Sequence, residues 1–102
     1  MKQQIASKTG VGSSPSLATD LYISPFNVGF GVVATGTVTY TVQHTFDNLA
    51  TVASPVWFSH PTIFGKSDNQ DGNYAFPVAA IKVLVTAGAG TAAITLIQAG
   101  IA

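Results

Sequence analysis

The chain has 102 residues, of which only 8% are charged, and four lysines balance four aspartates to a formal net charge of zero. It contains no arginine, glutamate or cysteine, so a disulfide framework and a thiolate metal site are excluded. Nucleic-acid binding draws most of its affinity from lysine and arginine on phosphates, and four scattered lysines argue against it. Soluble domains average roughly 25% charged residues, so this composition predicts a surface that other protein covers.

The chain opens with a polar segment, residues 1–15, which ends in a stretch rich in glycine and serine before Pro15. It lacks the apolar core of a secretory signal. We predict a flexible N-terminal arm over residues 1–15, which either reaches a neighbouring subunit or frays, followed by a single β domain over residues 16–102.

Strand patterns begin after this arm. Residues 17–24 and 26–34 are predicted strands, the second interrupted by two glycines. Residues 37–46 then alternate strictly: Val38, Tyr40, Val42, His44 and Phe46 share one face, and threonines and a glutamine share the other. This period of two predicts a half-buried strand, ended by a turn at residues 47–48.

The remaining pattern is less regular. Residues 49–52 fit either a short strand or a helical turn, residues 56–58 form a compact apolar strand between two prolines, and residues 67–73 read as a polar loop. Residues 78–87 and 91–101 are predicted to pair as a hairpin across a glycine-alanine turn. Both of these strands are apolar on both faces, which predicts that a second subunit covers one face.

The segment 83–102 carries no charge and has the length of a membrane span. Its glycines and β-branched residues favour strands instead, so no membrane association is expected. Together the patterns predict an all-β fold, a compact antiparallel β-sandwich or jelly-roll-like barrel of about six to eight strands with a flexible N-terminal arm.

No motif points to catalysis. His44 fits a buried histidine, and His60 lies in a predicted loop without a nucleophile elbow that would define a triad. The sequence of residues 67–78 partly matches the pattern of a calcium-binding loop, but Ser67 and Val78 stand where that loop needs acidic ligands. We therefore expect no enzyme activity, no cofactor, no metal and no small-molecule substrate.

The aromatic residues offer a different kind of site. Tyr22, Tyr40, Trp57 and Tyr74 could form a stacking platform for sugar rings, but Tyr40 and Trp57 sit in apolar contexts that favour core or interface packing. As candidate interface anchors we predict Trp57, Phe58, Phe64 and Tyr74; the alternative for these four is the protein's own core.

Two stretches carry a family resemblance. Residues 24–33 (SPFNVGFGVV) running into 37–47 (TVTYTVQHTFD), and residues 71–81 (DGNYAFPVAAI) continued to 98–100, resemble a family of small virion proteins of tailed bacteriophages. The resemblance covers most of the chain after residue 20 and transfers no site residue. It implies a structural virion protein, in the first place a capsid decoration or cement protein on the outer surface of the phage head.

Such a protein would bind the major capsid protein and stabilise the head lattice through many repeated contacts, as a homo-oligomer, either dimer or trimer. A phage tail, baseplate or head-fibre component is the alternative within the virion. A carbohydrate-binding or host-recognition module is the alternative from another class. Copy number in the particle separates the virion alternatives, and an exposed Trp57 that responds to glycans would favour the sugar binder.

Overall fold

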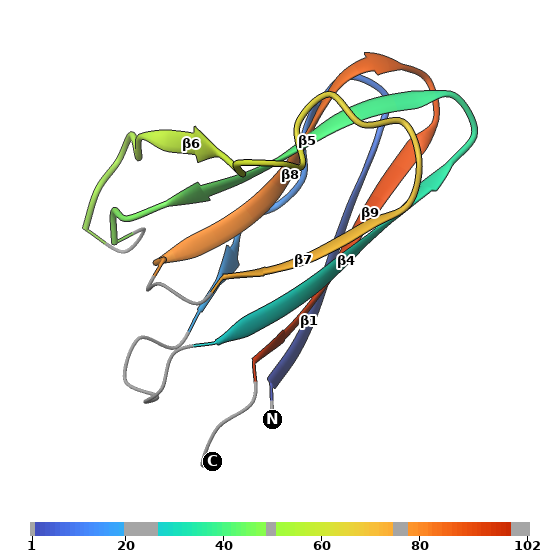
Figure 1. Ribbon diagram of the computed structural model, residues 1–102. Coiled ribbons are helices and arrows are strands. Elements are labelled where there is room, and N and C mark those ends of the chain that lie inside the picture. The colour runs from blue at the N-terminus through green and yellow to red at the C-terminus, as the bar shows by residue number, and fades with distance from the viewer. Residues whose placement is uncertain (1, 20–26, 49–50, 75–77, 99–102) are drawn as a thin grey trace.

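The computed structural model describes residues 2–19, 27–48, 51–74 and 78–98. In these ranges the chain forms nine strands in two antiparallel sheets packed face to face (Figure 1). The predicted all-β sandwich is confirmed, and the strand number exceeds the expected range because two strands have only two residues each. The described residues include no helix that is long and apolar enough to cross a membrane.

The two sheets have the same internal order. The first contains, from edge to edge, β1 (Lys2–Thr9), β9 (Thr91–Gln98), β4 (Val28–Thr35) and β7 (Gln70–Tyr74). The second begins with β2 (Gly12–Ser13) and β3 (Leu17–Ala18), which both pair with β8 (Ala80–Gly88), and continues through β5 (Val38–Thr45) to β6 (Trp57–Ser59). The strands β1 and β2, β9 and β8, β4 and β5, and β7 and β6 therefore hold corresponding places in the two sheets.

The chain crosses between the sheets at one end of the sandwich, where the connections from β1 to β2, β4 to β5 and β8 to β9 lie together (Figure 1). Gly88 has a φ of 92°, and a Cβ on it would lie 2.3 Å from the Thr37 carbonyl oxygen. A Cβ on Gly90 would lie 2.4 Å from the Thr35 carbonyl oxygen, and its N–H donates to the Thr37 carbonyl at 2.8 Å. Only glycine allows the two crossings to pack this closely.

These crossings overturn the predicted C-terminal hairpin. Residues 78–87 and 91–101 were expected to pair with each other, but β8 pairs with β5, β2 and β3, and β9 pairs with β1 and β4. The glycine turn sends the chain into the opposite sheet instead of back along the same one. Coverage of the outer faces of β8 and β9 by a second subunit stays a prediction.

Two further predictions were wrong. Residues 2–13 of the predicted flexible arm form β1 and β2, and β1 pairs with β9 along its whole length. Residues 70–73 of the predicted polar loop belong to β7, which pairs with β4. In both cases the stabilising partner is a strand distant in sequence, so local polarity gave no sign of it.

The core lies between the sheets and is built by alternation along the strands. On β5, Val38, Tyr40, Val42 and His44 are buried as predicted, whereas Phe46, just beyond the strand, is 56% exposed. β4 and β9 contribute Val28, Phe30, Val32, Ala92, Ile94 and Leu96, and β8 contributes Ile81, Val83 and Val85. Of the predicted strand 17–24, β3 is the described part; residues 20–24, 49–50, 75–77 and 99–101 lie outside the described residues.

Candidate functional site

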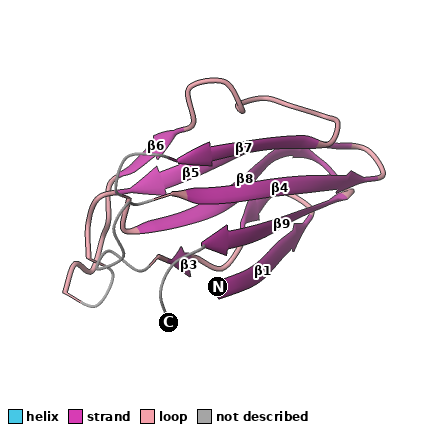
Figure 2. Ribbon diagram, turned by 60° about the horizontal axis from the view of Figure 1, so that its bottom comes forward, coloured by secondary structure: helices cyan, strands magenta, loops and turns pink. Residues whose placement is uncertain are grey.

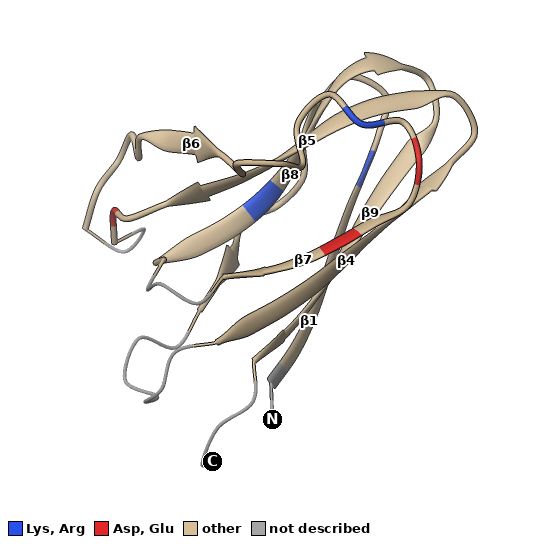
Figure 3. Cartoon of the chain, in the orientation of Figure 1, with Lys and Arg blue, Asp and Glu red and all other residues tan. Residues whose placement is uncertain are grey.

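The surface carries few charges, and those described are scattered over the molecule (Figure 3). The outer face of the first sheet is an extended and nearly neutral area. The register of the four strands places these residues on it: Gln3, Ile5, Ser7, Thr9, Gly29, Gly31, Val33, Thr35, Asp71, Asn73, Thr91, Ala93, Thr95 and Ile97. Among these described positions Asp71 is the one ionisable side chain.

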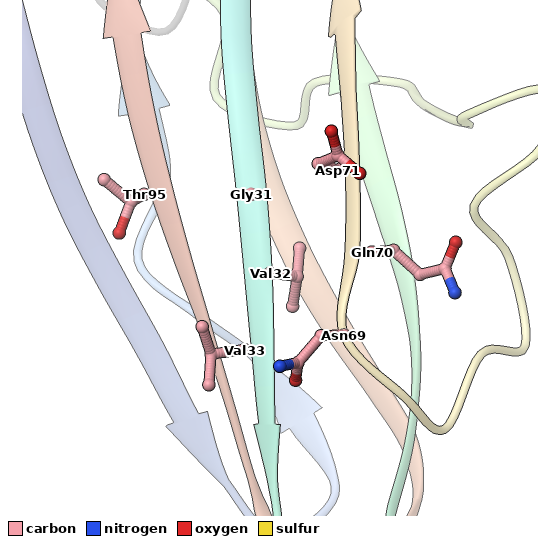
Figure 4. Close-up of a pocket in the computed structure, with 7 residues that line it drawn as sticks. All are labelled: Gly31, Val32, Val33, Asn69, Gln70, Asp71 and Thr95. Atoms are coloured by element: carbon pink, nitrogen blue, oxygen red, sulfur yellow. The ribbon is translucent and has the colours of Figure 1, made fainter.

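A hollow lies in this face beside Gly31, a β4 residue that has no side chain (Figure 4). Its lining comprises Gly31, Val32, Val33, Asn69, Gln70, Asp71 and Thr95. A Cβ built on Gly31 would lie 4.0 Å from the Gln70 carbonyl oxygen, and one built on the nearby Gly29 would meet nothing within 4 Å, so the β4 backbone is bare at both positions. The Asn69 side-chain oxygen accepts the Ala34 N–H at 2.8 Å, which fixes one wall. With one carboxylate, one hydroxyl and no histidine, the hollow can seat a protruding side chain but holds no acid–base pair.

Exposed apolar side chains occur on this face and at two other places. Ile5 is 66% exposed, Val33 54% and Ile97 41%, all on the outer face of the first sheet. Phe46 and Phe58, with ring centroids 5.7 Å apart, lie at the far end of β5, and Phe64 lies in the segment beside β5. Sequence reasoning missed the first group; residues 3–7 (QQIAS) show no period of two that would have placed Ile5 on a strand.

The four predicted interface anchors have different environments. Phe58 and Phe64 are 47% and 57% exposed, so both are available to a partner. Tyr74 is only 1% exposed and belongs to the core, which is the alternative that the sequence left open. Trp57 is half-buried, and the Lys82 ammonium nitrogen lies 4.2 Å from its ring centroid.

Among the described residues, Tyr40 and Tyr74 do not join Trp57 in the sugar platform considered from the sequence. Tyr40 and Tyr74 are buried between the sheets, and Tyr22 lies outside the described residues. Lys82 covers one face of the Trp57 ring, where a stacked sugar would need a bare surface.

Both histidines are buried in an aromatic cluster between the sheets. The His44 Nδ1 lies 2.8 Å from the Tyr74 hydroxyl, as expected for a core histidine. His60, expected in a loop, is also buried, and its Nδ1 accepts the backbone N–H groups of Thr62 and Ile63, each at 3.2 Å. Its ring also bonds the Asn73 backbone of β7. His60 therefore joins the 60–66 segment to the first sheet.

The electrostatics of this cluster favour neutral side chains. Burial lowers the pKa of His44, with a further lowering from the nearby His60. Burial also lowers the pKa of His60, partly offset by its bond to the Asn73 backbone. Desolvation raises the pKa of Tyr74, and desolvation followed by the charge of Asp68 raises the pKa of Tyr40 to about 12. The polar groups of the cluster are buried and hydrogen-bonded, so the cluster has a packing role.

Within the described ranges no three histidine or aspartate side chains gather to hold a metal ion. Comparison with protein-family models, with curated proteins and with solved structures found no significant match. Among the described residues, the surface of the sandwich is therefore the candidate for a functional site, and the outer face of the first sheet is an extended, nearly neutral part of it.

Proposed function

We propose that the chain is a structural, non-enzymatic virion protein that decorates the outer surface of a phage head and stabilises the lattice of the major capsid protein. One observation supports the docking role above the others. The outer face of the first sheet is neutral, carries two bare glycines, and exposes Ile5, Val33 and Ile97. The assignment to a virion is supported by the family resemblance of residues 24–47 and 71–81.

Such a face suits a large protein surface because it costs little to dehydrate. Apolar area removed from water contributes roughly 25 cal/mol per Å², whereas each unpaired charge buried in an interface is expensive. Asp71 is the one described ionisable group on this face, and it lies on the edge strand β7. A partner can therefore cover β1, β9 and β4 without burying a charge of this chain.

Binding at each position can be weak and still stabilise a shell. A lattice repeats the same contact many times, so modest individual affinities add to a large resistance against opening. The exposed Phe58 and Phe64 supply aromatic anchors for neighbouring contacts. The buried histidine cluster and the tight glycine crossings give a rigid body, which limits the entropy lost on docking.

The test is rebinding of the purified chain to particles that lack it. Val33→Asp places a charge at the centre of the outer face, and Thr86→Asp, at an exposed position on β8 in the other sheet, is the matched control. We expect Val33→Asp to reduce binding at least about tenfold and to leave the particles as heat-sensitive as unoccupied ones, while Thr86→Asp binds normally.

Equal binding by both variants would contradict docking through this face. If the wild-type chain binds no particle but its Trp57 fluorescence responds to glycans, the carbohydrate-binding alternative replaces the proposal. Binding at only a few sites per particle would favour the tail, baseplate or head-fibre alternative.

A further inference from the structure

The four edges of the sandwich differ in how they are protected against pairing with another strand. Free edges invite intermolecular pairing, and proteins usually shorten, break or cover them. β2 and β3 have two residues each and are separated by Pro15, and β6 has three residues. Beside β6, the 60–66 segment covers β5 with bonds such as the Tyr40 N–H to the Lys66 carbonyl at 2.8 Å.

The edge at β7 is also modified. This strand has five residues with Gly72 in the middle, where a Cβ would lie 3.2 Å from the Ile63 side chain. The His60 ring bonds the backbone of Asn73. The 60–66 segment therefore packs against β7 and covers part of this edge.

Within the part of the chain that the structure describes, β1 has none of these features. It is eight residues long, contains neither glycine nor proline, and keeps an unbroken register with β9 from Lys2 to Thr9. It is the outermost strand of the first sheet, and within the described residues β9 is its one strand partner (Figure 2). Its two lysines stand near its ends, and the Lys8 side chain lies against Gly12 of the second sheet rather than across the edge.

We propose that β1 pairs antiparallel with β1 of a second copy of this chain, joining the first sheets of two molecules into one continuous sheet. A strand can pair with itself only antiparallel about a two-fold axis, and opposite residues must share a face. A zero net charge removes long-range repulsion between the copies. The inference specifies how the homo-oligomer expected from the sequence would form, and it does not depend on lattice binding.

Charge disfavours one register of this pairing. An axis at Ile5 would place Lys2 opposite the second copy's Lys8 twice, and like charges directly opposite are unfavourable. An axis at Ala6 places Gln4 opposite Lys8 and Ile5 opposite Ser7. The 66% exposed Ile5 side chain is then partly covered on the outer face, next to Ile97. The dimer presents both outer faces on the same side.

The first test is sedimentation equilibrium of the full chain over a concentration series. We expect a reversible dimer, weakened at least about tenfold in Ile5→Lys, because the exchange removes apolar contact and places a charge at the pairing edge. Val33→Lys puts the same charge on the same face but on β4, two strands away, and should dimerise like the wild type. Both sites are exposed, and circular dichroism melting verifies that each variant is folded.

The second test reads the register directly, since the chain contains no cysteine. An oxidised mixture of Ile5→Cys and Ser7→Cys proteins should form a disulfide-linked heterodimer, and a mixture of Ile5→Cys with Val33→Cys should not. A wild-type chain that stays monomeric over the whole series, or a dimer that Ile5→Lys leaves intact, would overturn the proposal. Neither result bears on the particle-rebinding experiment, so the two proposals fail separately.

Discussion

Acidification should destabilise this protein through its two buried histidines. His44 and His60 are 5% and 9% exposed, and burial lowers the pKa of both from 6.5. The unfolded chain therefore binds protons at a higher pH than the folded protein does. Stability is complete above the unfolded pKa, and it decreases as the pH falls through 6.5 toward the lowered pKa values of the folded state.

The size of the effect follows from the number of protons taken up on unfolding. A histidine that stays neutral in the fold and has an unfolded pKa of 6.5 contributes a loss of about 1.4 kcal/mol between about pH 7.5 and about pH 5.5. Two such histidines contribute at most about 2.7 kcal/mol. His60 resists protonation for a structural reason: its Nδ1 already accepts the N–H groups of Thr62 and Ile63.

The assay is urea unfolding followed by circular dichroism at about pH 7.5, 6.5 and 5.5, with the free energy of unfolding extrapolated to water. Single variants His44→Phe and His60→Gln should each lose roughly half of the pH dependence attributable to histidine, whatever their stability at neutral pH. The double variant should lose this component. A wild-type protein whose stability changes by less than about 0.5 kcal/mol over this range, or a double variant with an unchanged slope, would refute the reasoning.

Four further substitutions, one of them a control, test the packing. Gly88→Ala should destabilise the protein by about 2–4 kcal/mol in thermal melts, because its Cβ would lie 2.3 Å from the Thr37 carbonyl oxygen at a positive φ. The control Gly29→Ala places its Cβ in open space and should stay within about 0.5 kcal/mol of wild type. Tyr74→Phe removes the hydroxyl that contacts the His44 Nδ1 and should cost about 1–2 kcal/mol in urea unfolding; no loss would show that this bond does not contribute. Lys82→Met removes the cation above the Trp57 ring, so it should change stability by less than about 1 kcal/mol and shift the Trp57 emission, and an unchanged spectrum would contradict the contact.

The sandwich was predictable where burial imposes a period of two. The alternation of Val38, Tyr40, Val42 and His44 identified β5 and its inward face. Sheet membership was not predictable, because a glycine turn such as residues 88–90 is compatible with both a hairpin and a crossing between sheets. The close approach of Gly88 to Thr37, which decides between them, joins residues that are 51 positions apart in the sequence.

The surface was harder to predict than the core. Tyr74 and Phe58 look alike in sequence, since both are aromatic residues in short strands, yet one is buried and the other is 47% exposed. Ile5 lay in a segment whose polarity predicted a flexible arm, so its place on an edge strand went unnoticed. Which side of a short strand faces the core is set by its pairing partner, and that information is not local.

The most direct test of the central claim is the number of copies of this chain in purified particles, measured by quantitative mass spectrometry against the major capsid protein. A lattice-binding decoration protein should be present in a number close to that of the capsid protein, and removing it should lower the temperature at which the heads open. A few copies per particle, or a particle that is complete and equally heat-resistant without this chain, would contradict the account.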